Sequence, residues 1–246
     1  MSRIMTPPWP RWADLKLPLL SWLAAAVLLL AGCSVRAEED KPFSIEPVKG
    51  NVYRVLAGHY RSVFMVTDAG IFVADPINPA AARWLKSQLQ ARFDAPVRYL
   101  AYSHSHPDHA LGGEVLDGPA VTVIAHVRAA EDMAWTRLPT ARPEVRFADQ
   151  LTVTLGESSV QLQYYGPNNG RGSVSMRFMP ANVMFVVDWV LVGRMPYRNF
   201  QGYDVHGVIR STRALLAQPR FDVFVGGHGD VGTWEDVKFY LGYMEA

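Results

Sequence analysis

The chain has 246 residues, of which 49% are hydrophobic and 19% are charged, so it is long enough to bury the core of one globular domain. Its 24 basic and 23 acidic residues give a formal net charge of +1 at pH 7, with no long run of Lys or Arg. This balance argues against nucleic acid as the substrate, because strongly basic surfaces bind phosphate backbones.

The N-terminal segment has the pattern of an export signal. Arg3, Arg11 and Lys16 precede an uncharged apolar stretch over residues 17–32, which is short for a membrane span and suits the core of a signal peptide. The stretch ends in Leu30-Ala31-Gly32-Cys33, which resembles the bacterial lipobox, whose cysteine is lipidated and becomes the mature N-terminus.

Cys33 is the only cysteine of the chain, and a lone thiol here fits an anchor better than a disulfide or a catalytic nucleophile. Cleavage after Ala37 and an uncleaved anchor are the alternatives, and all three place the protein outside the cytoplasm. We expect a signal peptide over residues 1–33, a polar linker over 34–42 and one domain over 43–246, tethered to a membrane in the bacterial periplasm. Without residues 1–37 the chain keeps 20 basic and 22 acidic residues.

The first half of the domain is predicted to begin with strands and continue into a helix. Residues 52–56, 62–67 and 70–74 are expected strands, with a turn at 68–70. Asn78 and Pro79 then start a helix as its cap and first residue. Leu85, Leu89 and Phe93 give this helix an apolar stripe at four-residue spacing, which indicates packing against the core.

Three of the chain's seven histidines lie within His104-Ser105-His106-Pro107-Asp108-His109, directly after an apolar run over 97–102 that predicts a buried strand. Imidazole and carboxylate are ligands that zinc takes, so the segment predicts a metal-binding loop; a solvated polar loop is the alternative. His104 and His106 leave one face of an extended segment and can share a metal. Pro107 disfavours helix before it and turns the chain, so that Asp108 and His109 can point at a second position about 3.5 to 4 Å away.

A short helix is expected at 110–113, and another apolar run follows at 121–125. The second half predicts alternating strands at 151–155, 160–164 and 174–178, and an apolar strand at 183–187 that ends at Asp188. Helices are expected at 204–217 and at 234–244, the latter capped by Thr233. This order of elements, with strands first, a helix between, strands again and a helix last, predicts two sheets packed face to face with helices outside.

On these motifs the chain resembles the metallo-β-lactamase-fold hydrolase superfamily. The family has four motifs in a fixed order: His-x-His-x-Asp-His, Gly-Pro-x-His, an Asp at a strand end, and Gly-His. This chain has a similar order, with residues 104–109, then Gly166-Pro167-Asn168-Asn169, then Asp188, then Gly227-His228. The resemblance covers the chain from about Phe43 to the C-terminus. It implies a four-layer αββα sandwich of the α+β class.

The resemblance also implies a ligand set for two metals. One position would use His104, His106 and a third histidine, the other Asp108, His109 and His228, and Asp188 would bridge them. Asn169 stands where the third histidine is expected, and no histidine lies between His126 and His206. Because an amide oxygen is a poor substitute for imidazole, we expect one tightly bound zinc at the second position and a weak or absent zinc at the first. The Asn168-Asn169 pair is alternatively a turn, which leaves the first position equally deficient.

The expected chemistry is hydrolysis of an ester, thioester, lactone or lactam, in which zinc lowers the pKa of water toward about 7 and polarises the carbonyl. Asp188 indicates a glyoxalase II-like or esterase-like member, because the β-lactamases usually carry Cys or Ser there. We expect Asp108, His104 and His106 to take part in catalysis, the two histidines as proton acceptors or donors if their metal position is empty.

A small molecule is the expected substrate, and no obligate protein partner is inferred. The loop over 193–203, with Arg194, Tyr197, Arg198, Phe200 and Tyr203, lines a pocket for an anionic substrate or covers the core. His59, His126 and His206 are expected to be structural or on the surface. Asp75, at another strand end, either supports a metal-binding histidine or is a turn residue.

Two other functions stay open. The first is a mono-iron enzyme of the same fold that oxidises a sulfur compound, which the missing histidine at Asn169 disfavours. The second is a non-catalytic periplasmic binding or accessory protein with a degenerate metal site. The presence of Asp108, His109, Asp188 and His228 together argues against it.

Overall fold

The computed structural model describes residues 43–199 and 202–246. The chain divides into two units, residues 1–40 and 41–246, and the described residues belong to the second unit. The predicted signal peptide, the lipidated Cys33 and the predicted linker lie outside the described residues.

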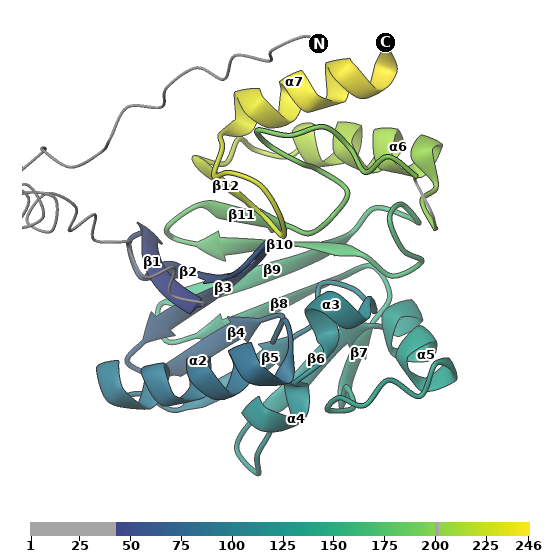
Figure 1. The fold of residues 1–246 in the computed structure, drawn as a ribbon. Coiled ribbons are helices and arrows are strands. Elements are labelled where there is room, and N and C mark those ends of the chain that lie inside the picture. The colour runs from purple at the N-terminus through teal and green to yellow at the C-terminus, as the bar shows by residue number, and fades with distance from the viewer. Residues whose placement is uncertain (1–42, 200–201) are drawn as a thin grey trace, which may run out of the picture. The chain divides into compact units, whose positions relative to one another are not determined.

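The second unit contains a seven-stranded sheet in the order β1-β2-β3-β4-β5-β6-β7 (Figure 1). β1 to β4 pair antiparallel through tight hairpins, and β4 to β7 pair parallel. The strands are β1 (Phe43–Lys49), β2 (Val52–Ala57), β3 (Tyr60–Thr67), β4 (Gly70–Ala74), β5 (Val97–Ala101), β6 (Thr122–His126) and β7 (Val145–Phe147).

A five-stranded sheet in the order β12-β11-β10-β9-β8 faces it. Its strands are β8 (Gln150–Leu155), β9 (Ser158–Tyr164), β10 (Val174–Met179), β11 (Val183–Val186) and β12 (Val223–Gly226). β11 and β12 pair parallel, so their carboxyl ends lie at the same edge of the sheet.

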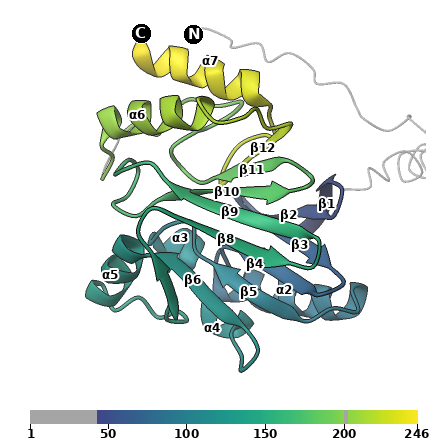
Figure 2. The ribbon, with the colours of Figure 1, turned by 180° about the vertical axis from the view of Figure 1, so that it is seen from behind.

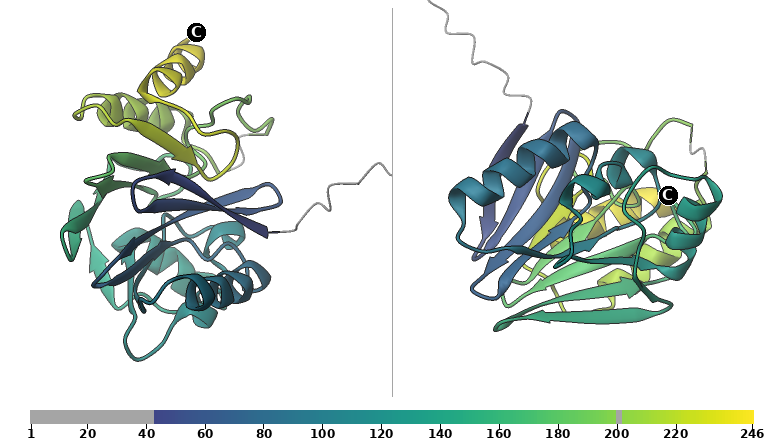
Figure 3. Two further views of the ribbon diagram at one scale, coloured as in Figure 1. Left: turned by 90° about the vertical axis from the view of Figure 1, so that its left-hand side faces the viewer. Right: turned by 90° about the horizontal axis from the view of Figure 1, so that it is seen from below.

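Helices cover the outer faces of both sheets (Figures 1 and 2). The seven-stranded sheet carries α2 (Pro79–Arg92), α4 (Gly113–Leu116) and α5 (Val127–Trp135), and the five-stranded sheet carries α6 (Val205–Leu216) and α7 (Trp234–Glu245). The short α3 (Pro107–Ala110) follows β5. Figure 3 shows the same four layers from two further sides. This is the αββα sandwich of the α+β class that the sequence predicts.

Alternation along the strands explains the layers. In β3, Val63 and Met65 join the cluster between the two sheets, while Phe64 joins the cluster under α2. β4 is buried over its whole length because both of its faces are covered, as expected for a strand inside a layered sheet. Asn78 caps α2 by accepting hydrogen bonds from the first-turn amides of Ala80 and Ala81, as its position before Pro79 predicts.

The sequence prediction missed the short α3 and four further elements. β1 contains Pro47, beside a register shift in its pairing, and a proline is tolerated there because β1 is an edge strand. β7 has only three residues, and α5 follows β6 without an intervening loop, so neither has a clear boundary signal. β12 is a four-residue apolar run, which periodicity alone does not distinguish from a helix segment. Within the described ranges, no helix has the length and hydrophobicity needed to cross a bilayer.

Phe178→Ala tests the packing between the sheets. The Phe178 ring of β10 is fully buried and meets the Phe72 ring of β4 edge to face, with centroids 5.8 Å apart. We expect the free energy of unfolding to fall by about 3 to 5 kcal/mol in urea denaturation, because a cavity forms between the layers. Trp135→Ala removes a side chain that is 89% exposed and should change it by no more than about 0.5 kcal/mol. Equal effects of the two substitutions would contradict this account of the core.

Candidate metal centre

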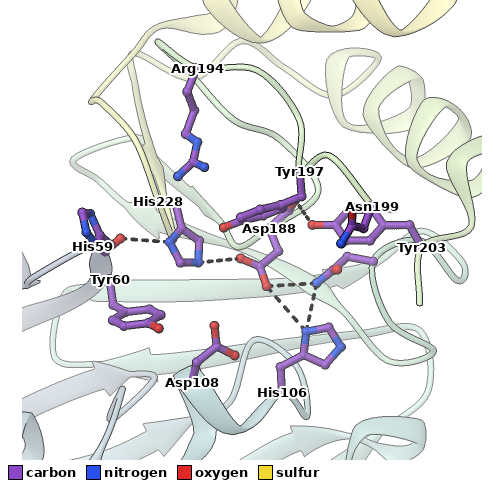
Figure 4. Close-up of a pocket in the computed structure, with 11 residues that line it drawn as sticks. His59, Tyr60, His106, Asp108, Asp188, Arg194, Tyr197, Asn199, Tyr203 and His228 are labelled. Carbon is purple, nitrogen blue, oxygen red and sulfur yellow. Dashed lines mark hydrogen bonds and ion pairs between the residues drawn. The ribbon is translucent and has the colours of Figure 1, made fainter. Parts of the chain in front are cut away.

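Strand ends bring the predicted site residues together at one edge of the sandwich, and Figure 4 shows His106, Asp108, Asp188 and His228 of this group. Asp75 follows β4, the segment from His104 to His109 follows β5, Asp188 follows β11 and His228 follows β12. The loop after β9 adds Asn169. Such convergence at carboxyl strand ends is where open α/β sheets place their sites.

Two short helices follow the first motif. α3 starts at Pro107, contains Asp108 and His109 and was not predicted, whereas α4 begins at Gly113, within the range 110–113 where the sequence predicts a short helix. Proline fits the first helical turn because its missing N–H would have no helical acceptor there. Pro107 therefore ends the extended part at His106, as expected, and also opens the helix that points Asp108 and His109.

The carboxylate of Asp188 lies at the centre of the candidate site. Its Oδ2 is 3.1 Å from His104 Nε2 and 3.6 Å from His106 Nδ1. Its Oδ1 is 3.0 Å from His228 Nε2 and 3.6 Å from His109 Nε2. One carboxylate oxygen thus faces each pair of histidines, which is the bridging arrangement that the family resemblance implies.

Two groups of candidate ligand atoms result, each with its atoms within 4.8 Å of one another. The first contains His104, His106 and Asp188. The second contains Asp108, His109 and His228, with 3.1 Å between the two Nε2 atoms and 3.9 Å from His109 Nε2 to Asp108 Oδ2.

Backbone and hydroxyl partners assign the ring protons. His228 Nδ1 is 2.9 Å from the carbonyl oxygen of His59, so it carries the proton and donates. Asp75 accepts hydrogen bonds from the Ser103 amide (2.8 Å) and the Ser103 hydroxyl (2.6 Å), so that hydroxyl accepts in turn from His104 Nδ1 at 2.8 Å. Both rings then present an Nε2 lone pair to the site, and Asp75 is a support for His104 through Ser103.

These donors fit a divalent cation. His104 Nε2 and Asp188 Oδ1 are buried atoms without a hydrogen-bond partner. Burial of unpaired polar atoms is costly; a cation at the first position would satisfy His104 Nε2, and a cation at the second would satisfy Asp188 Oδ1. Imidazole nitrogen and carboxylate oxygen form the donor set that zinc accepts.

Burial keeps the rings of His104 and His109 neutral at pH 7. It lowers the pKa of His104, and it lowers the pKa of His109 to about 3, against the opposing charge of Asp188. Burial also opposes ionisation of Asp188, but its contacts with the imidazole rings of His104, His106 and His228 outweigh it and hold the pKa of this carboxyl well below its usual range. Neutral imidazole and ionised carboxylate are the protonation states that bind metal.

Asn169 lies in the first half of the centre and presents its amide NH₂ group there. Its Nδ2 donates to Asp188 Oδ2 at 3.1 Å and is 3.5 Å from His106 Nδ1. Its backbone amide donates to the Asn168 side chain at 2.6 Å, within a bend of the loop after β9. In this orientation Nδ2 of Asn169 offers donors to the first position, and the ligand atoms there are two imidazole nitrogens and one carboxylate oxygen.

A cavity of about 620 Å³ opens over the centre. Tyr60 and Tyr197 pack against the His228 ring, with centroids 5.3 and 5.7 Å away, and the Arg194 guanidinium lies 5.0 Å from the Tyr197 ring. The loop after Gly193 therefore lines the cavity, and Tyr197 and Tyr203 also pack against the core cluster of the five-stranded sheet, so the loop has both of the roles considered for it. The lining residues are His59, Tyr60, His106, Asp108, Asn169, Asp188, Arg194, Tyr197, Asn199, Tyr203 and His228.

The remaining predicted residues have other places. Phe200 lies outside the described residues. His126 is buried, caps α5 and stacks on Tyr164 at 4.0 Å, and His206 lies on α6; neither lines the cavity. His59 and Tyr60, by contrast, line the cavity and were missed as site residues. In the sequence these two residues only indicate a turn between two strands. They approach His228 because the Tyr60–Arg61 segment pairs with Gly227, which is far away along the chain.

The model of the metallo-beta-lactamase superfamily matches residues 46–236, so the chain belongs to that superfamily. Solved structures agree on the fold. A metallo-beta-lactamase from Pontibacter korlensis has a TM-score of 0.74 and 17% sequence identity, covering 82% of this chain and 99% of its own. The DIM-1 metallo-beta-lactamase has a TM-score of 0.70 and 16% identity, covering 82% and 97%.

A curated relative from Nocardioides sp. (strain JS1661) is named 2,4-dinitroanisole O-demethylase subunit alpha. It is 28% identical over 195 residues, which are 78% of this chain. The chain spans 59% of the length of that relative.

Asn169→His should raise the zinc content of the purified protein from about one to about two equivalents after dialysis, because the first position gains a third protein nitrogen. Elemental analysis measures the zinc, and cobalt substitution followed by visible absorption checks the coordination. Gln218→His, which adds an imidazole on the exposed surface after α6, is the matched control and should stay near one equivalent. Two equivalents in the unsubstituted protein would contradict the assignment.

Proposed function

We propose that the protein is an exported zinc-dependent hydrolase. The observation that carries the proposal is that Asp108, His109 and His228 bring ligand atoms within 4.8 Å of one another, and that one oxygen of Asp188 faces both histidines, beneath a cavity of small-molecule size. These four residues would hold the ion. Zinc at this position would supply a Lewis acid and a water whose pKa is lowered toward about 7.

The residues around the ion have distinct roles in this proposal. His106, whose side chain is 37% exposed, faces the cavity and can take a proton from water or return one to the leaving group. His104 is almost fully buried, so it positions Asp188. Burial, followed by the charge of Asp188, raises the pKa of Tyr197, so its phenol keeps its proton and can donate to an oxyanion.

The reaction class is hydrolysis of an ester, thioester, lactone or lactam carbonyl. Asp188 in place of Cys or Ser favours the ester and thioester side of this range. A first position that binds zinc weakly also fits hydrolysis with one ion, since a single tightly bound zinc already activates water. These features support a hydrolase over the mono-iron oxidase and over a binding protein without chemistry.

A second candidate reaction is cleavage of an activated aryl ether, which the relative named 2,4-dinitroanisole O-demethylase subunit alpha favours. The ring carbon that bears the methoxy group in that compound is electron-poor and accepts a nucleophile much as a carbonyl carbon does. Attack of water there gives 2,4-dinitrophenol and methanol. Tyr60, Tyr197 and Tyr203 supply aromatic surface in the cavity for such a ring.

An activity panel separates these reactions. We expect the zinc-loaded protein to release 4-nitrophenol from 4-nitrophenyl esters, and the panel also contains a thioester, a lactone, nitrocefin and 2,4-dinitroanisole. Chelation should abolish turnover, and His228→Asn should lower kcat/KM at least a hundredfold, because it removes a ligand of the tight position. His206→Asn, on the exposed side of α6, is the matched control. Stoichiometric iron with oxygen uptake, or no turnover with zinc bound, would refute the hydrolase proposal.

Export and lipid tethering are also proposed, on the basic residues, the apolar stretch and Cys33 of residues 1–42. In a bacterial host, the protein should incorporate radiolabelled palmitate and fractionate with membranes. Cys33→Ala should abolish both, because it removes the acylated thiol. Labelling that persists in this variant, or a wild-type protein that is soluble in the cytoplasm, would show that residues 1–42 have another role.

A further inference from the structure

A groove of about 350 Å³ lies beside the cavity of the metal centre, between the segment after β11 and helix α7. Its walls are mainly apolar and aromatic, formed by Leu191, Val192, Met195, Phe239, Tyr240 and Tyr243. Met195, Phe239 and Tyr243 are 61%, 80% and 46% exposed. Single exposed apolar side chains are ordinary, but three that line one groove indicate a binding surface.

Arg194 connects the groove to the candidate metal centre, because its side chain lines both. In the cavity its guanidinium lies against Tyr197, and its aliphatic carbons approach Gly229, the residue after His228. Figure 4 shows Arg194 above His228 at the margin of the cavity. The cavity over the metal centre and the groove are therefore adjacent, with the Arg194 side chain between them.

The groove offers little to a charged occupant. Arg194 and Asp236 are its charged lining residues. The Asp236 carboxylate is already engaged, because it accepts hydrogen bonds from the amide and the hydroxyl of Thr233 in the capping box of α7. The Arg194 guanidinium lies over the Tyr197 ring at the margin of the cavity, so an unbranched apolar chain can bury its surface against Met195 and Phe239 without displacing it.

We propose that this groove binds the apolar chain of the substrate while its ester or thioester carbonyl lies at the ion. The substrate class is then a medium-chain acyl ester or thioester. This inference rests on the proposed hydrolase function and narrows it. A volume of 350 Å³ is at the lower end of the range for small-molecule pockets, which suits a single chain.

The test is a series of 4-nitrophenyl esters from acetate to dodecanoate with the full-length zinc-loaded protein. We expect kcat/KM to rise about twofold per methylene from butanoate to octanoate, because full burial of a methylene gives roughly fourfold and the groove is open on one side. Phe239→Gln and Met195→Gln should each flatten this slope. Trp135→Ser, which removes an exposed apolar side chain on α5, should keep it.

Calorimetric titration of the same proteins with decanoate and with acetate gives a readout that needs no turnover. Decanoate should bind the unsubstituted protein at least tenfold more tightly than acetate does, and Phe239→Gln should remove most of this difference. If decanoate behaves so while no ester is hydrolysed, the groove assignment stands and the hydrolase proposal fails. Hydrolysis with a flat series and no preference for decanoate would overturn the groove assignment. A dimer in size-exclusion chromatography that Phe239→Gln abolishes, with a flat series, would overturn it in favour of a second copy of the chain.

Discussion

The site depends on one buried carboxylate. Asp188 is 5% exposed and has four imidazole nitrogens within 3.6 Å, from residues separated by up to 124 positions along the chain. Its backbone has a φ of 68°, in the left-handed region that non-glycine residues rarely occupy. Such a conformation persists only where its surroundings impose it, here the end of β11 and the hydrogen bond from the Tyr203 hydroxyl to the Asp188 carbonyl.

The fold supplies this carboxylate with its partners through parallel pairing. β4 and β5 pair in parallel, so Asp75 and Ser103 meet at one edge, and Ser103 relays that contact to His104. β11 and β12 pair in parallel in the other sheet and bring His228 beside Asp188. The hydrophobic packing between the sheets then holds the two halves of the centre at a fixed separation, because close-packed interiors deform little.

The sequence predicts those parts of the fold and of the candidate site that depend on residues close together along the chain. The spacing of His104, His106, Asp108 and His109 predicts a site because it lies within six residues and after one strand. The αββα layering follows from strand alternation and from caps such as Asn78 and Thr233. Tyr60 and the groove beside Phe239 were not predictable, since each depends on segments that only the folded chain brings together.

Asn169 makes the two positions of the candidate metal centre different, although each has two imidazole rings and faces one oxygen of Asp188. Its Nδ2 donates to the Asp188 oxygen that faces His104 and His106, so that oxygen is already engaged on one side. The other oxygen has no such donor and is directed at His109 and His228. A cation gains most where the carboxylate oxygen is free and two ring nitrogens converge, and this is the half next to Asp108. The half with Asn169 is left with His106, whose ring is exposed to the cavity and suited to proton transfer.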